Sequence, residues 1–370
     1  MNERLTLADR LDQHRAFWQR RPQERPLAAF RIGDFFFSRH FEAAHPLLVP
    51  KAHVYPEMIA VDAYIHDYER MFAESESLQQ DGFWTAEPFT GIPWMEAILG
   101  CDIIGAEASF STTHPYNSAA EATDAIEALL AGGDDSAEPP NRWLDLYLEF
   151  TRMLVSISGG RFPVAQPIMR GPTDMVAALL GQQDMVYALI DDPQTMHRLV
   201  EAVTSVFLRT ISLQQALVPT FEGGSSLGFY HVWAPGRSIW FQDDLSALLS
   251  PDLYREFFLP AARSICSAYE YTAVHLHSSS FHVLDDLLSL PELKSVEVNK
   301  DIGGPSIAEM MPVFEKVLQK KALIIWGDLT PEELAQIESR LPARGLFLHI
   351  VVPTMEEAAE LNAHIQSWEQ

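Results

Sequence analysis

The segment TAVHLH at residues 272–277 is the first of four short apolar runs that decide the fold. Stretches with apolar residues at helical spacing separate the runs, and a pair such as Thr330-Pro331 is typical of a helix start. The runs begin roughly 20 to 28 residues apart, which suits parallel strands joined by crossover helices. They are TAVHLH (272–277), SVEV (295–298), ALIIW (322–326) and LFLHIVV (346–352).

The same alternation continues toward the amino terminus in four weaker runs. Together with the first four they predict one α/β domain over 1–370, a (β/α)8 TIM barrel. A helical N-terminal extension is expected over about 1–25, and the aromatic-rich stretch over about 33–100 is expected to be an insertion that covers one barrel mouth. The weaker runs are PLAAFRI (26–32), CDIIGA (101–106), FPVAQPI (162–168) and GGSSLGF (223–229).

The net charge of the chain disfavours some classes of binding partner. Its 51 acidic and 26 basic side chains give a formal charge of −25, which disfavours nucleic acids and anionic membrane surfaces. The two cysteines, Cys101 and Cys266, form no CxxC pair, so neither a disulfide framework nor a thiolate zinc site is expected. Since no signal peptide and no apolar run of membrane length is found, a cytoplasmic location is expected.

Two histidines at the end of the first run are the sharpest candidates for chemistry. His275 and His277 are two positions apart on a strand, so both imidazoles face the same side. Glu297 ends the next strand and His349 lies in the last one, and barrel enzymes place their working groups at such strand ends. The four side chains predict a site for zinc or another divalent ion. The alternative is that each histidine is a hydrogen-bonded core residue.

The segment VWAPGRSIWFQDDLSALLSP (232–251) contains a second group of candidates. Either Asp243 or Asp244 is predicted to act as a base or substrate anchor, and the other is expected to cap a helix. The two tryptophans beside an arginine would suit a wall for a flat or anionic ligand, or they pack a lid. These residues are Trp233, Arg237 and Trp240.

Further substrate-binding candidates lie near other strand ends. Arg170, in MRGPTD after the run at 162–168, would present two donors to a carboxylate, or pair with one of the many acids. Arg31 ends the first predicted strand and Trp94 lies in the insertion. Because the chain has no GxGxxG fingerprint, P-loop, GxSxG elbow or HExxH motif, nucleotide hydrolysis, serine hydrolysis and zincin proteolysis are disfavoured.

Several stretches resemble the uroporphyrinogen decarboxylase superfamily, a family of (β/α)8 barrels. The resemblance covers roughly 160–365 and extends poorly to the first 150 residues. Its motifs are diffuse, but there are several and they occur in the expected order. They are GPTDMVAALLGQQDMVYALIDDPQTMHRLVEAVT (171–204), LLSPDLYREFFLPAARSI (248–265), GGPSIAEMMPVFEKV (303–317) and GLFLHIVVPTMEEAAELN (345–362).

The resemblance implies a choice between two chemistries. Branches similar to corrinoid:thiol methyltransferases and cobalamin-independent methionine synthase bind zinc through an HxC pair, a later acid and a final cysteine. The matching positions here are His275, His277, Glu297 and His349, so histidine replaces both thiolates. Imidazole ligands leave a more Lewis-acidic ion, better suited to oxygen than to thiol activation. The resemblance leaves the methyl donor and acceptor open, and a corrinoid on a partner protein is one candidate carrier.

The decarboxylase branch gathers substrate carboxylates with an arginine-rich motif, of which Arg31 and Arg39 are all that this chain keeps. Our first interpretation is therefore a metal-dependent, methyltransferase-like enzyme acting on a small molecule, with Asp244 and Arg170 orienting the substrate. The alternative is a cofactor-independent decarboxylase, a lyase in which Arg31, Arg170 and Arg237 anchor carboxylates and Asp244 is the acid. A ligand-binding barrel without catalysis is the third interpretation. Relatives in the superfamily often pair, which implies a homodimer.

Overall fold

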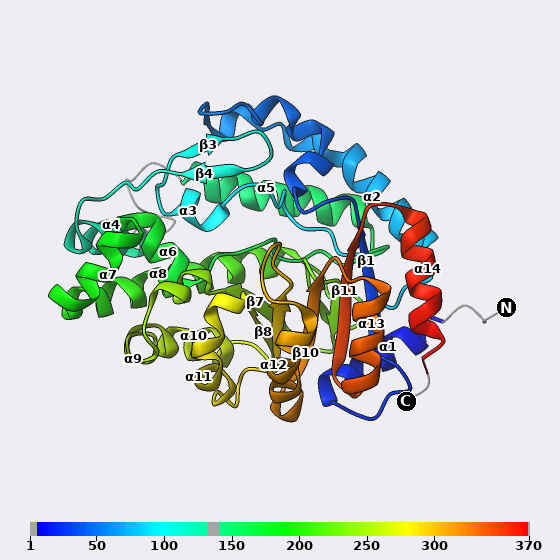
Figure 1. Ribbon diagram of the computed structural model, residues 1–370. Coiled ribbons are helices and arrows are strands. Elements are labelled where there is room, and N and C mark those ends of the chain that lie inside the picture. Colours follow the sequence, from blue (N-terminus) through cyan, green and yellow to red (C-terminus); the bar gives the residue numbers. More distant parts are fainter. Residues whose placement is uncertain (1–5, 132–140, 369–370) are drawn as a thin grey trace.

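A computed structural model describes residues 6–131 and 141–368, and its centre is a six-stranded parallel sheet (Figure 1). The four apolar runs of the carboxyl-terminal half are four consecutive strands of this sheet, as predicted. The fold is a mixed, barrel-like α/β fold. In sheet order the strands are β1 (Leu27–Ile32), β11 (Leu346–Val352), β10 (Ala322–Gly327), β9 (Ser295–Asn299), β8 (Tyr271–Leu276) and β7 (Ser238–Gln242).

Two irregular segments lie between β1 and β7. The backbone N–H groups of Asp81 and Gly82 donate to the carbonyl oxygen of Ala28 on β1, at 2.9 and 3.2 Å. Parallel bridges join Ala86 to Val164 and Arg170 to Gln242. The segments 81–86 and 163–170 therefore connect the two edges of the sheet. Pro163 and Pro167 have no N–H to donate, which explains why FPVAQPI forms one isolated bridge, at Val164, and not the strand that was predicted.

Two of the predicted barrel strands were wrong. CDIIGA contains β3 (Ile103–Gly105), which lies in a separate antiparallel sheet with β2 (His53–Val54) and β4 (Phe110–Thr112). GGSSLGF contains β5 (Ser225–Leu227), which pairs antiparallel with β6 (Val232–Ala234). Antiparallel partners need only a short connection, so both runs pair with close neighbours in the chain. The sixth strand of the main sheet, β7, lies in segment 232–251, which is not among the predicted strands.

Helices cover the outer side of the strands. In β11, Leu346, Leu348 and Ile350 belong to the large core shared with the helices, whereas Phe347 and Val351 belong to a second core on the inner side. Strands buried on both faces read as continuous apolar runs. The helices that follow α6 (Pro172–Leu180) are α7 (Gln182–Asp191), α8 (Pro193–Leu217), α9 (Pro251–Leu253), α10 (Leu259–Ser267), α11 (Leu284–Leu288), α12 (Ile307–Lys320), α13 (Pro331–Arg340) and α14 (Met355–Gln366).

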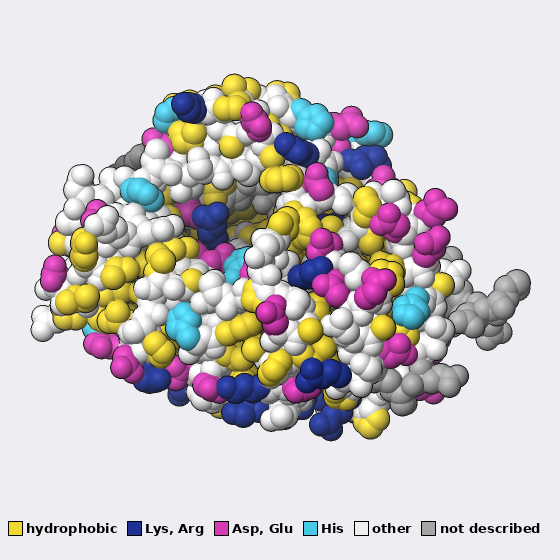
Figure 2. All heavy atoms as spheres, in the orientation of Figure 1, with side chains coloured by type: hydrophobic (Ala, Val, Ile, Leu, Met, Phe, Trp, Pro, Cys, Tyr) yellow, Lys and Arg dark blue, Asp and Glu magenta, His cyan; other side chains and the backbone are white. Residues whose placement is uncertain are grey.

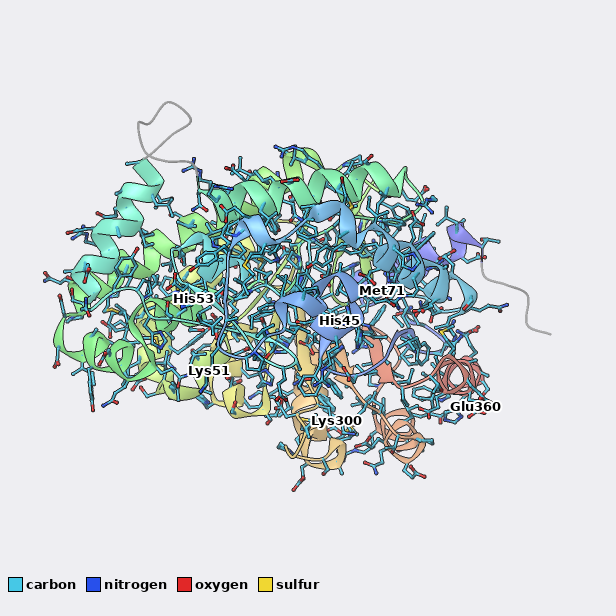
Figure 3. All side chains as sticks on the ribbon, turned by 90° about the horizontal axis from the view of Figure 1, so that it is seen from above. His45, Lys51, His53, Met71, Lys300 and Glu360 are labelled. Atoms are coloured by element: carbon cyan, nitrogen blue, oxygen red, sulfur yellow. The ribbon has the colours of Figure 1, made fainter. Side chains whose placement is uncertain are left out.

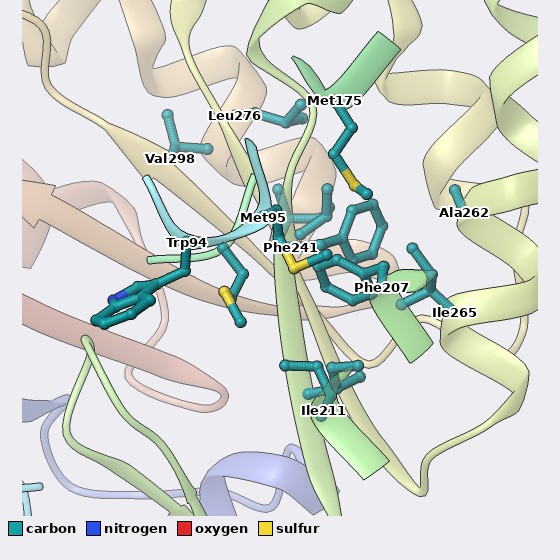
Figure 4. Packing of buried hydrophobic residues seen from close by; sticks show 14 of the residues in the cluster. Trp94, Met95, Met175, Phe207, Ile211, Phe241, Ala262, Ile265, Leu276 and Val298 are labelled. Atoms are coloured by element: carbon teal, nitrogen blue, oxygen red, sulfur yellow. The ribbon is translucent and has the colours of Figure 1, made fainter. Parts of the chain in front are cut away.

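The outer core is packed with large side chains. Figure 4 shows Phe207 of α8 and Ile265 of α10 beside Phe241 of β7. The start of α13 is as predicted, because Thr330 caps the helix in a capping box and Pro331 follows it. Although α8 extends over 25 residues, none of the helices in 6–131 and 141–368 combines the length and the apolar character needed to cross a membrane.

The insertion lies over the carboxyl ends of the strands (Figure 1). Phe35 and Phe37 pack against Trp326, near the carboxyl end of β10, with ring centroids 5.1 and 5.9 Å apart. We call the insertion, about 33–100, the covering layer. Between 37 and 64 it contains a series of short 3-10 helices. Its regular helices are α2 (Ile65–Ser77) and α3 (Trp94–Ile98), and α4 (Ala119–Ala131) and α5 (Arg142–Ser158) follow it.

The opposite end of the barrel-like sheet is closed by α1 (Leu7–Gln19), which Thr6 and Asp9 begin with a capping box. The ring of Phe17 lies 5.9 Å from that of Phe347, at the start of β11, and the indole of Trp18 donates to the carbonyl of Trp233. The helix predicted in the N-terminal extension therefore contributes to the core.

We expect His14 on α1 to make the protein sensitive to acid. It is fully buried, accepts from the Trp233 N–H and faces the Asp81 carbonyl, and burial lowers its pKa from 6.5 to about 4. The stability of the neutral form is present above pH 6.5 and is lost as the pH falls toward 4. Between pH 7 and pH 5 this histidine alone lowers the free energy of unfolding by about 2 kcal/mol.

Urea unfolding of the wild type and of His14→Gln at both pH values measures this effect. The variant should lose about 2 kcal/mol less than the wild type between pH 7 and pH 5, whereas the exposed-site control His364→Gln should follow the wild type. Equal losses in all three proteins would contradict the assignment.

Candidate metal centre

Three side chains converge beyond the carboxyl ends of β7 and β8. His275 is on β8, His277 follows the strand, and Asp244 begins a 3-10 helix after β7. The strands place them together because Gln242 of β7 pairs with His275 of β8. Asp244 Oδ1 lies 3.6 Å from Nε2 of His275 and 3.8 Å from Nε2 of His277. The three ligand atoms lie within 4.8 Å of one another, so the group can hold a metal ion.

The group is buried on one side and open on the other. His275 is 6% exposed, whereas the side chains of Asp244 and His277 are 27% and 31% exposed. Asp244 Oδ1 and His275 Nε2 are buried atoms without a hydrogen-bond partner. Buried polar atoms are rarely left without a partner, and a cation between these atoms would satisfy both. The exposed side leaves a path by which a small molecule can reach Asp244 and His277.

A carboxylate lies behind the first imidazole. Nδ1 of His275 contacts Oε2 of Glu297 on β9, and the hydroxyl of Tyr230 donates to the same oxygen at 2.8 Å. Burial lowers the pKa of His275, but the carboxylates of Glu297, Asp244 and Asp174 outweigh it and raise that pKa to about 9. With Nδ1 directed at Glu297, the other nitrogen of His275 faces Asp244.

The second imidazole has its own carboxylate. Nδ1 of His277 contacts Oδ1 of Asp301, which also accepts from the Asn299 amide at 2.6 Å. The other oxygen of Asp301 accepts from the N–H and the hydroxyl of Ser278. Metal-binding histidines typically direct their second nitrogen at such a carboxylate, which fixes the ring and its tautomer.

Asp243 and Asp244 differ in surroundings although they are neighbours in the chain. The carboxylate of Asp243 is buried, where Thr173 and Tyr254 donate to it at 3.0 and 2.8 Å, and burial raises its pKa to about 7. Asp243 therefore joins α6 to the helical turn at 254–258. Asp244 is the member of the pair that faces the imidazoles.

More charges adjoin the cluster on the side of α6. The Asp244 N–H donates to Oδ2 of Asp174 at 2.9 Å, and burial together with the two neighbouring aspartates raises the pKa of Asp174 well above its usual value. Arg170, which carries an exposed fraction of 43%, lies 2.7 Å from the buried Glu96. It lines a cavity of about 220 Å³ together with Phe35 and Phe37. Figure 2 shows a hollow below the covering layer, in which basic, acidic and histidine side chains lie.

Two of the predicted ligands lie outside the converging group. Glu297 contacts the far nitrogen of His275, as described above. His349 on β11 is fully buried with its ring 5.1 Å from that of His231, and neither of its nitrogens has a hydrogen-bond partner. Burial and the nearby charge of Arg31 lower the pKa of His349 well below its usual value, which keeps it neutral.

The tryptophans predicted to bind substrate are all buried elsewhere. Trp94 lies in the outer core beside Tyr147, and its indole donates to the Phe89 carbonyl. Trp240 lies in the inner core, where its ring is 4.8 Å from that of Tyr230. Trp233 packs near α1, where the other end of the sheet is closed. The three tryptophans therefore do not form a wall of the group made by Asp244, His275 and His277.

The remaining arginines are also separated from the cluster. Arg237 precedes β7 at the end of the strand remote from Asp244 and stacks on Tyr269 at 4.8 Å. Arg31 lies over the rings of Phe37 and Phe229 and 3.7 Å from Glu87. It lines a different cavity, of about 460 Å³, which also includes His45 and Met71. Figure 3 looks down on this region and shows those two residues close together.

Sequence reasoning missed Tyr230 and the role of Asp174. It also missed the role of Asp301, which follows β9. A pattern in the sequence does indicate Asp301, because positions 297, 299 and 301 alternate along β9 and its continuation, so their side chains share one face. Asp174 occupies the first turn of α6, where an acidic residue suits the helix dipole without any other role. Tyr230 lies in a turn after β5 and has no distinguishing pattern.

Comparison with known proteins finds similarity among solved structures. No family model matches the chain, and no curated protein matches it significantly. Among solved structures, a methyltransferase from Methanosarcina mazei superposes with a TM-score of 0.62 at 16% identity, and the match covers 98% of each chain. At this identity the likeness shows that the two chains share a fold over their whole length.

Proposed function

We propose that this protein is a metal-dependent enzyme of the methyltransferase type, with Asp244, His275 and His277 as the metal ligands. The observation that carries the proposal is the convergence of Asp244 Oδ1 and two imidazole Nε2 atoms within 4.8 Å, two of these atoms being buried without a partner. The fold shared with a methyltransferase and the resemblance to methyl-transferring zinc barrels support the reaction class.

The ligand set suits a catalytic ion. Three protein ligands and an open position are typical of catalytic zinc, and two histidines with one carboxylate also suit ferrous iron. We favour zinc, because the superfamily branches that this chain resembles use it. When bound, such an ion supplies a Lewis acid able to polarise an oxygen or sulfur of a small molecule.

The protein's own side chains would position the ion and the substrate. Glu297 and Asp301 hold the imidazoles with Nε2 toward Asp244, so we assign them as positioning residues and give His349 no ligand role. Arg170 is placed to orient an anionic group of the substrate, although Glu96 already pairs with it. The phenylalanine-lined cavity beside Arg170 would keep water from the reacting groups. A corrinoid protein would deliver or remove the methyl group.

We also propose that the sheet closes as a (β/α)8 barrel. The bridges at 81–86 and 163–170 support this, because with them eight chain segments follow one another around the core. Both irregular segments then take the places of barrel strands.

The decarboxylase alternative has less support. It needs several arginines directed at one substrate, but Arg31, Arg170 and Arg237 line three different cavities. A porphyrinogen with many carboxylates would find no common cluster of cations among them.

Methyl transfer from free methylcobalamin tests the proposal. Zinc-loaded protein should catalyse the loss of the methyl group in the presence of one of a panel of thiols and alcohols, followed by the visible spectrum of the corrinoid. Asp244→Asn and His277→Ala should abolish the reaction. A zinc-loaded protein that binds members of the panel but transfers no methyl group would instead favour the ligand-binding barrel.

A further inference from the structure

A third cavity lies at the end of the barrel-like sheet remote from Asp244, His275 and His277. Its volume is about 320 Å³, within the range of small-molecule sites. Strand β7 begins at this cavity with Ser238 and ends with Gln242, two residues before Asp244. A strand of this length extends roughly 15 Å, so a ligand in the cavity would not reach the imidazoles.

The cavity has a preformed rim. Ser225 on β5 accepts from the Ser238 N–H and donates to the Gly236 carbonyl, both at 2.8 Å, which ties the β5–β6 hairpin to the start of β7. Gln215 near the end of α8 donates to the Ser238 carbonyl at 3.0 Å. At Gly224 a Cβ atom would lie 2.0 Å from the carbonyl oxygen of Ala234, so only glycine allows the hairpin to close this tightly.

The walls combine apolar and polar groups. Val164, Val218 and Phe221 offer apolar surface, whereas Ser212 and Thr220 offer hydroxyl groups. Ligand sites typically have this composition, with a mostly apolar lining and a few polar groups that fix the orientation of the ligand.

The charge of the cavity is opposite to that of the protein. Although the chain has 51 acidic residues, the described lining contains no Asp or Glu and one charged side chain, Arg237. In the described part of the chain Arg237 makes no ion pair within 4.0 Å, and Tyr269 holds its guanidinium from one face at 4.8 Å. A guanidinium without a carboxylate partner, beside an apolar cavity, suits a carboxylate or sulfonate on a flat ligand.

We propose that this cavity binds a small molecule with a flat apolar body and one anionic group, and that Arg237 binds the anion. The site is independent of the metal cluster and of the function proposed for it. From the sequence, Arg237 and its neighbouring tryptophans were predicted to bind a flat or anionic ligand. The proposed site for such a ligand is at the end of β7 remote from Asp244.

Isothermal titration of the full-length protein with 2-naphthoate tests the proposal, with neutral 2-naphthamide as the matched compound. Arg237→Gln should weaken naphthoate binding roughly tenfold or more and leave naphthamide unchanged. Ala216→Phe, which adds bulk at the exposed end of α8 inside the lining, should abolish the binding of both. Arg263→Gln removes the same charge from an exposed position on α10 and should bind as the wild type does.

His277→Ala separates this site from the metal cluster, because it should leave naphthoate binding unchanged. The proposal is overturned if the protein binds no naphthoate at millimolar concentration. It is also overturned if Arg237→Gln and Ala216→Phe bind as the wild type does, or if His277→Ala loses the binding.

Discussion

Purified, untagged protein is expected to contain close to one divalent ion per chain, and His275→Ala, His277→Ala and Asp244→Ala are each expected to lose it. The proposed ion would join three ligands whose atoms lie within 4.8 Å of one another. Removing one ligand from three should weaken binding by more than the roughly 10- to 100-fold that loss of an outer partner costs. Inductively coupled plasma mass spectrometry measures the content and distinguishes zinc from iron.

Variants behind the imidazoles give a graded comparison. Glu297→Gln and Asp301→Asn keep the shape of the side chain but remove the charge that faces each Nδ1. They should retain some metal, with affinity lowered by roughly 10- to 100-fold. His66→Ala, which changes an exposed histidine of the covering layer, should keep the wild-type content. A wild-type protein without metal after growth in supplemented medium would exclude the proposed centre. If Glu297→Gln and Asp301→Asn lost as much metal as the three ligand variants, the assignment of Glu297 and Asp301 as positioning residues would be wrong.

The sequence predicted the sheet best where burial on both faces leaves a continuous apolar run. LFLHIVV (346–352) and ALIIW (322–326) are of this type, and both are strands. SIWFQ (238–242) is equally apolar, but Gly236 and Arg237 before it and two aspartates after it suggest a loop. Segment 163–170 shows the converse, because its prolines prevent regular pairing, and only isolated bridges join it to Ala86 and to Gln242 of β7.

Within the site, alternation along a strand was enough to bring His275 and His277 together. It could not decide which carboxylate completes the group, since Asp243, Asp244 and Glu297 all come from the same end of neighbouring strands. That choice depends on whether a side chain is held by Tyr254, by an imidazole Nδ1 or by neither, and these contacts join residues from distant parts of the chain. Aromatic residues such as Trp233 gave no signal that separates a cleft wall from a core.

Asp81→Ala is expected to lower the free energy of unfolding by about 3–5 kcal/mol, the cost of breaking a buried ion pair. Asp81 is fully buried at the start of the irregular segment that stands beside β1. Its two carboxylate oxygens accept from Nη1 and Nη2 of Arg25 at 2.7 and 2.9 Å, and one of them also accepts from the Ala28 N–H. The substitution leaves the Arg25 guanidinium, which is 11% exposed, without a carboxylate partner, and it leaves the buried Ala28 N–H without the acceptor that Asp81 provides.

The position of Asp81 explains why this loss should exceed that of any surface pair. The irregular segments have few ladder hydrogen bonds. The carboxylate of Asp81 therefore accepts from the Ala28 N–H of β1, a bond that a backbone carbonyl would make in a regular strand. Glu127→Ala is the matched control, since Glu127 and Arg198 are also 2.7 Å apart but 45% and 54% exposed, and it should cost less than about 1 kcal/mol. Urea unfolding of both variants measures the difference. If Asp81→Ala were no more costly than Glu127→Ala, the segment at 81–86 would not be held to β1 by this ion pair.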